Sequence, residues 1–207
     1  MANLALETAV SHQHHITHIA GLDEAGRGAL AGPVVAAAVI LPLNDQIETL
    51  LHGVNDSKQL SAKKREVLFE LICQHALAYG IGQQPAAVID AIGILPANKL
   101  AMQTAVTQLT PTPQFLLIDG RIRLPQLNIR QQSIIRGDSQ SLSIAAASIL
   151  AKVTRDRLMC ELDGQFPHYG FAQHKGYGTE LHRAAIAQHG PCPQHRHSFA
   201  PIRQPLL

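Results

Sequence analysis

The sequence predicts a mixed α/β protein, in which helices flank a central sheet that begins with a hairpin. Two apolar strand-like segments, residues 18–23 and 32–41, are separated only by a turn rich in glycine and alanine. Further along the chain, segments with helical spacing of apolar residues alternate with short apolar runs typical of buried strands. The length of 207 residues allows one sizeable core, and the hydrophobic fraction of 46% can fill it.

Composition narrows the class of protein. Aromatic residues make up 4% of the chain and tryptophan is absent, so the core must consist of alanine, leucine, isoleucine and valine. Three widely spaced cysteines argue against a disulfide framework or a cysteine-based zinc site, and they favour a reducing cytosol. The chain shows no signal peptide and no apolar run near the roughly 20 residues of a membrane span. We therefore expect a cytoplasmic protein without membrane contact, and the net charge of +2 does not by itself indicate a partner.

The first half of the chain is predicted to contain three strands and a helix. Residues 1–16 form a polar segment that we expect to be flexible. The strands 18–23 and 32–41 follow, and a third strand is predicted at 75–83. Between the second and third strands, Ser61 is a candidate N-cap, because apolar residues recur at helical spacing after it.

The second half alternates helices with strands. A helix is predicted over 98–109, and the sequence PTPQ ends it. The sequence FLLID at 115–119 has the continuous apolar character of a strand buried on both faces, and a further strand is predicted to end within 133–136. The alanine-rich segment 141–162 predicts a long helix, which a Gly-Asp pair precedes.

The last part of the chain is predicted to form a small helical appendage. A loop over 166–178 leads to a helix over 179–188, which a Gly-Pro pair ends. We therefore expect three regions: a flexible segment 1–16, a main domain 17–165, and a loop-and-helix subdomain 166–207 packed on that domain.

Acidic side chains stand at the ends of these predicted elements. The four residues are Asp23, Glu24, Asp119 and Asp138. If the strand 18–23 neighbours the strand 115–119, three or four carboxylates converge, and their mutual repulsion would leave at least one protonated. A divalent cation relieves this repulsion, and an all-carboxylate set suits Mg²⁺ or Mn²⁺ rather than Zn²⁺.

The same residues also have ordinary explanations. A single aspartate at a strand end is more often a turn residue than a ligand, and the helix dipole favours Asp138 where it stands. The Gly26-Arg27-Gly28 triplet either forms a simple tight turn or lets the backbone approach a sugar–phosphate, with Arg27 at a phosphate. Spacing alone leaves these alternatives open.

Six sequence blocks resemble the ribonuclease HII family and occur in the same order as in that family. The resemblance spans residues 19–202. The blocks are GLDEAGRGALAGPVVAAAVIL, NDSKQLS, LLIDG, IIRGDSQSLSIAAASILAKVTRD, FPHYGFAQHKGYGT and HRHSFAPI. The resemblance implies an RNase H-like fold, with 17–165 as the catalytic domain. It also implies a catalytic, metal-binding site at Asp23, Glu24, Asp119 and Asp138, which depends on Mg²⁺ or Mn²⁺.

The resemblance further implies a substrate and a partner. The family hydrolyses the RNA strand of RNA–DNA hybrids and cuts 5′ to single ribonucleotides in duplex DNA, by two-metal catalysis that leaves a 3′-OH and a 5′-phosphate. This activity belongs to ribonucleotide excision repair and primer removal, and we expect a monomer. By the same resemblance Gly26, Arg27 and Gly28 recognise the 2′-OH, Tyr177 packs on that sugar, and Lys58 contacts a phosphate.

Basic residues near the acids have two interpretations. Lys175 is a phosphate contact or a solvated surface group. Four arginines between the third and fourth acids form either a basic rim for nucleic acid or a solvated loop: Arg121, Arg123, Arg130 and Arg136.

Three residues depart from the family pattern, and none is a carboxylate. Ala29 stands where proline is frequent, Arg136 where lysine is common, and Gly93 where asparagine is usual. Two rival functions remain as alternatives. A related nuclease acting on DNA junctions would cut all-DNA substrates, and a non-catalytic nucleic-acid binder would have lost carboxylates.

Overall fold

A mixed sheet forms the centre of the computed structural model, which describes residues 2–54 and 60–203. Within these residues the sheet has five strands in the order β3-β2-β1-β4-β5. The strands are β1 (Ile19–Ala25), β2 (Val34–Ile40), β3 (Ala78–Gln84), β4 (Phe115–Asp119) and β5 (Arg130–Ile134). β1, β2 and β3 form an antiparallel meander, and β4 and β5 extend the sheet in parallel with β1. The predicted mixed sheet with an initial hairpin is therefore confirmed.

The register of β1 and β4 places two acidic residues at one edge of the sheet. Leu22 pairs with Ile118, so the next residue of each strand, Asp23 and Asp119, reaches the same edge. The predicted adjacency of these two strands is confirmed. β1 continues to Ala25 beside β2, so Asp23 lies within β1 and not at its predicted end. β5 ends at Ile134, within the predicted range of 133–136, and Arg136 then turns the chain with a left-handed φ of 56°.

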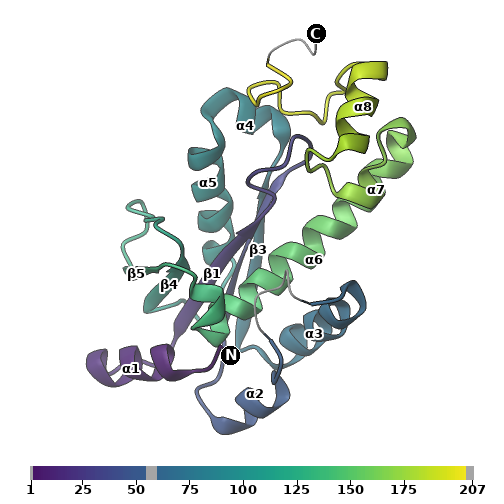
Figure 1. Cartoon of the computed structure of the whole chain (residues 1–207). Coiled ribbons are helices and arrows are strands. Elements are labelled where there is room, and N and C mark those ends of the chain that lie inside the picture. The colour runs from purple at the N-terminus through teal and green to yellow at the C-terminus, as the bar shows by residue number, and fades with distance from the viewer. Residues whose placement is uncertain (1, 55–59, 204–207) are drawn as a thin grey trace.

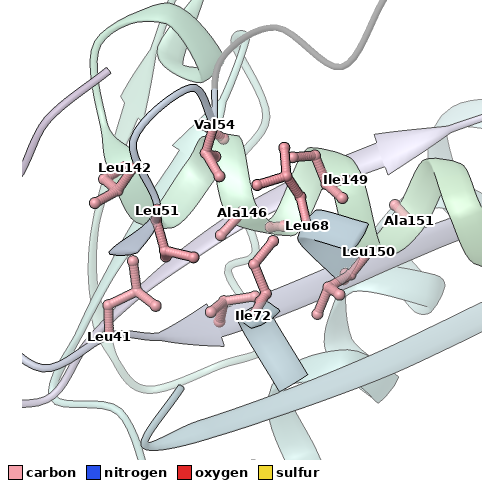
Figure 2. Close-up of a cluster of buried hydrophobic side chains, with 14 of the residues drawn as sticks. Leu41, Leu51, Val54, Leu68, Ile72, Leu142, Ala146, Ile149, Leu150 and Ala151 are labelled. Atoms are coloured by element: carbon pink, nitrogen blue, oxygen red, sulfur yellow. The ribbon is translucent and has the colours of Figure 1, made fainter. Parts of the chain in front are cut away.

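One face of the sheet is covered by α6 (Leu142–Gln165), with α3 (Ala62–His75) and α2 (Asp45–Leu50) packed beside it (Figure 1). Figure 2 shows aliphatic side chains of α3 and α6 gathered in one cluster with Leu51, Val54 and Leu41, which directly follows β2. Ser61 caps α3 by accepting a hydrogen bond from the Lys64 N–H, as predicted. α6 is capped in the same way by Ser141, which accepts from the Ile144 N–H.

The opposite face is covered by α5 (Ile94–Thr107), and α4 (Ala86–Ile92) precedes it. Two glycines of β3 allow α5 to approach closely, since a Cβ at either Gly80 or Gly82 would lie 2.1 Å from a carbonyl oxygen of α5. The sequence did not predict α4. α5 begins four residues before its predicted start, because Pro96 lies in the first turn, where its missing N–H is tolerated.

The N-terminal segment was predicted to be flexible over residues 1–16, but the structure shows a helix there. These residues contain α1 (Ala5–His14), whose Val10 packs beneath the sheet. Glu7 of α1 is 1% exposed, and its Oε1 accepts hydrogen bonds from the Ser141 hydroxyl and from the N–H and hydroxyl of Ser143. α1 is therefore docked on the beginning of α6.

The C-terminal part packs against the end of α6. It contains the turns η3 (Pro167–Tyr169) and α7 (Phe171–His174) where a loop was predicted, then α8 (Glu180–His189) within one residue of its predicted bounds. Aromatic and aliphatic residues from these elements form a cluster with Leu30 and Met159. No helix of the described chain is both long and apolar enough to cross a bilayer.

Candidate active site

A cavity of about 460 Å³ opens where β1 and β4 end. Seven of the nine predicted site residues line it: Asp23, Glu24, Gly26, Arg27, Gly28, Asp119 and Tyr177. Of the other two, Asp138 acts electrostatically on Asp23, and Lys58 lies outside the described residues. The fold therefore gathers residues that are more than 150 positions apart in the chain, as far as Asp23 and Tyr177.

Asp23 lies at the centre of the acidic cluster. Its side chain is largely buried, and its Oδ1 accepts a hydrogen bond of 2.7 Å from the Glu24 N–H. Burial raises the pKa of Asp23 well above its ordinary value, and the charges of Glu24, Asp119 and Asp138 raise it further. The Glu24 N–H opposes this shift. The other three carboxyl groups are therefore close enough to Asp23 to act on its charge.

Glu24 is held at one oxygen and unpaired at the other. Its Oε1 accepts a hydrogen bond of 2.9 Å from Nη1 of Arg27, whose side chain is 52% exposed. Its Oε2 is buried and has no hydrogen-bond partner in the described chain. Burial raises the pKa of Glu24, whereas Arg27 and the amide of Asn98 lower it.

Asp119 fixes the turn that carries Asp138. Its Oδ1 accepts a hydrogen bond of 2.7 Å from the Gly137 N–H, at the start of the turn η2 (Gly137–Ser139). A Cβ at position 137 would lie 2.6 Å from Cδ1 of Ile144 and 3.3 Å from Oδ1 of Asp119. Glycine at 137 therefore permits the close approach of this turn to the end of β4.

The donor set of this site fits a hard divalent cation. In the described ranges, no group of three or more acidic, histidine or cysteine side chains is close enough to hold a metal ion as arranged. The donors are nevertheless all carboxylates, which Mg²⁺ and Mn²⁺ prefer. A nearby cation would give the unpaired buried oxygen of Glu24 a partner. It would also offset the repulsion that raises the pKa of Asp23.

The turn after β1 and the ring of Tyr177 form another wall of the cavity. Gly26 has a φ of 86° and packs on Arg155, where a Cβ would lie 1.9 Å from Nε. Gly28 faces open space, with no atom within 4 Å of a Cβ built on it. Tyr177 is 38% exposed, and the Arg155 guanidinium lies 5.3 Å from its ring centroid. This wall offers accessible backbone beside a half-exposed aromatic face.

Comparisons with known proteins assign the chain to a family. The family model described as ribonuclease HII matches residues 20–202. A ribonuclease HII of Chloroflexus aurantiacus is 56% identical over 191 residues, which cover 92% of this chain and 90% of the relative. The chain belongs to the ribonuclease HII family. It is accordingly a ribonuclease H enzyme, as the sequence blocks indicated.

Solved structures agree with the ribonuclease HII fold. The ribonuclease H2 of Pyrococcus horikoshii is 25% identical and superposes with a TM-score of 0.75, covering 90% of this chain and 95% of its own. Bst-RNase HIII in complex with Mn²⁺ is 19% identical, with a TM-score of 0.73, covering 94% of this chain and 70% of its own. The second likeness concerns the fold alone, and the predicted RNase H-like fold is confirmed.

Some residues of this ribonuclease HII site were not predicted, and some predicted residues lie elsewhere. Ser148 and Lys152 line the cavity from one face of α6, but residues four apart on a long helix give no sign of which neighbour they face. Lys175 is not a lining residue, since its ammonium donates to the carbonyl of Ala172 and to Sγ of Cys160. The four arginines between Asp119 and Asp138 do not line it either.

Proposed function

We propose that this enzyme hydrolyses the RNA strand of RNA–DNA hybrids and cuts 5′ to single ribonucleotides in duplex DNA. The observation that carries the proposal is one cavity shared by an acidic cluster, an open glycine turn and a half-exposed tyrosine. The acidic cluster would hold the cations that hydrolysis requires. The glycine turn and Tyr177 would bind the sugar of the ribonucleotide. We also propose that the enzyme acts as a cytoplasmic monomer in ribonucleotide excision repair and primer removal.

The four carboxylates would hold Mg²⁺ or Mn²⁺. Two such cations, when bound, would supply a water made nucleophilic and charge stabilisation of the departing 3′ oxygen, so that cleavage leaves a 3′-OH and a 5′-phosphate. Asp23 would contribute to holding these cations, and its interaction with all three other carboxylates supports this role. Asp119 lines the cavity and accepts a hydrogen bond from Gly137, so it would hold the turn that carries Asp138 against the end of β4.

The glycine turn and Tyr177 would select the ribonucleotide. Gly28 leaves room for a sugar to approach the backbone, whose N–H and C=O groups can bond to a 2′-OH, the group that distinguishes RNA from DNA. Tyr177 offers a ring against which that sugar can pack. Arg27 is half exposed beside Glu24 and can reach a phosphate, and Lys58 stays a predicted phosphate contact.

A panel of four end-labelled substrates tests this proposal. They are a duplex with one ribonucleotide, the same duplex in DNA alone, an RNA–DNA hybrid and a DNA junction. With Mg²⁺ or Mn²⁺ we expect cleavage of the first and third only, on the 5′ side of a ribonucleotide, and no cleavage in EDTA. Cleavage of the all-DNA duplex or junction would instead support the rival junction nuclease.

A further inference from the structure

Two arginines are completely buried behind the cavity wall that carries the glycine turn. Arg155 lies on α6 and Arg196 follows α8, and both are 0% exposed. Within the described chain, neither forms an ion pair with a carboxylate, and every hydrogen bond that their guanidinium groups make ends on a backbone carbonyl. Burying a charge without an opposite charge is costly, so these two residues call for an explanation.

Arg196 connects the two ends of the loop that follows β1. Its Nη1 donates to the carbonyl of Arg27 at 3.0 Å, and its Nε and Nη2 both donate to the carbonyl of Gly32, at 3.1 and 2.9 Å. Its backbone N–H also donates to the Leu30 carbonyl at 2.8 Å. The guanidinium therefore sets where the Gly26–Gly28 turn lies relative to the start of β2.

Arg155 connects the same loop to the segment that carries Tyr177. Its Nε and Nη2 donate to the carbonyls of Pro33 and Ala31, at 2.9 and 3.1 Å. Its Nη1 donates to the Lys175 carbonyl at 2.9 Å, two residues before Tyr177, whose ring it also faces. The contact of Gly26 with this guanidinium brings the turn and the tyrosine onto one charged group.

We propose that Arg155 and Arg196 are positioning residues that set the glycine turn and Tyr177 at the spacing one ribose requires. This inference rests on the proposed function, because it assigns that spacing to recognition of the 2′-OH. Arginine suits the task because its planar group donates several hydrogen bonds in fixed directions, which lysine cannot do. Neither residue touches the substrate, so both act through the backbone of the groups that do.

Binding selectivity distinguishes positioning from a general structural role. In the inactive Asp119→Asn background, the dissociation constant is measured by fluorescence anisotropy for a duplex with one ribonucleotide and for the identical all-DNA duplex. We expect Arg155→Lys and Arg196→Lys each to lower the ratio of the all-DNA dissociation constant to the ribonucleotide-duplex dissociation constant by about tenfold, the effect of one lost hydrogen bond. All-DNA binding should stay nearly unchanged, because that duplex offers no 2′-OH.

Arg157→Lys is the matched control. Arg157 lies two residues after Arg155 on the same helix, but its guanidinium pairs with Glu66 on α3, away from the turn. The ratio should be unchanged in this variant, and circular dichroism measures whether each of the three variants is folded.

Each result has one meaning. Folded lysine variants that keep the full ratio would overturn the positioning role. Failure of both variants to fold would overturn it as well, since the arginines would then serve the fold itself. A parent protein without any preference for the ribonucleotide would instead overturn the proposed function, and this outcome is visible before any arginine is changed.

Discussion

At the scale of single residues, the site is defined by charges held in unfavourable surroundings. Asp23 is buried, surrounded by three carboxyl groups, and compensated in part by one backbone N–H. Each unit by which a carboxyl pKa is raised corresponds to about 1.4 kcal/mol that the charged form loses on folding. The fold therefore carries a local cost at Asp23, as expected where function rather than stability determines the residue.

Asp23→Asn should stabilise the fold while it abolishes activity. The amide keeps the oxygen that accepts from the Glu24 N–H but removes the repelled charge. In EDTA we expect the melting temperature to rise, by about 2–4 °C for each kcal/mol gained. Mn²⁺ should raise the melting temperature of the wild type and have little effect on the variant. A lower melting temperature for Asp23→Asn in EDTA would contradict the repulsion at this residue.

Tyr177→Ala should impair cleavage selectively. A single ribonucleotide offers one correct sugar, whereas a long hybrid offers many binding registers, so loss of the ring should matter more for the first. We expect the loss of kcat/KM to be about tenfold larger on the single-ribonucleotide duplex, which corresponds to about 1.4 kcal/mol. Equal losses on the two substrates would count against the proposed role of Tyr177.

At the scale of elements, polar contacts between residues far apart in the chain hold short segments that bury few apolar side chains of their own. Three imidazoles link α7, α8 and the C-terminal segment: His174 stacks on His182, whose Nε2 lies 3.0 Å from Nε2 of His195. The Cys192 N–H donates to Nδ1 of His195, so the proton of that imidazole is on Nε2 and is donated to Nε2 of His182. His182 therefore carries its own proton on Nδ1 and donates it to the Tyr177 carbonyl. This chain of bonds requires neutral imidazoles.

Acidification should weaken these elements. Burial lowers the pKa of His182 and of His195 from 6.5 to about 4, so the unfolded chain takes up protons before the folded one. Stability should be full above pH 6.5 and fall between pH 6.5 and 4, by about 3 kcal/mol for each imidazole. Urea unfolding at successive pH values measures this, and His182→Asn should flatten the profile. An unchanged profile in the variant would contradict the assignment.

Docking of α1 should depend on its buried carboxylate. Glu7→Ala removes the acceptor of three hydrogen bonds from Ser141 and Ser143, and it leaves those donors buried. We expect a loss of about 2–4 kcal/mol in the free energy of unfolding. Glu161→Ala changes an exposed glutamate of α6 and is the control, with no comparable loss expected. Equal stability of the two variants would show that α1 is not held by Glu7.

At the scale of the whole molecule, what the sequence predicts depends on whether the signal is local. The run FLLID predicts β4, because a strand that is buried on both faces is continuously apolar. The same reasoning places Asp23 and Asp119 at strand ends, and the register then brings them together. α1 escaped prediction because the hydrogen bonds to Oε1 of Glu7 come from residues more than 130 positions away. Arg155 and Arg196 escaped as well, since charged residues on a helix and in a loop look like surface residues.

The central claim is that four carboxylates from three parts of the chain act as one cation-dependent site. It is tested most directly by changing each acid to its amide in turn and measuring single-turnover cleavage of a duplex with one ribonucleotide in Mg²⁺. We predict that Asp23→Asn, Glu24→Gln, Asp119→Asn and Asp138→Asn each lose about a thousandfold in rate, because each weakens the hold on cations that supply several kcal/mol. Asp119→Asn should still bind the duplex, and Glu161→Gln should cleave like the wild type. An Asp119→Asn enzyme that cleaves within tenfold of the wild-type rate would contradict the claim.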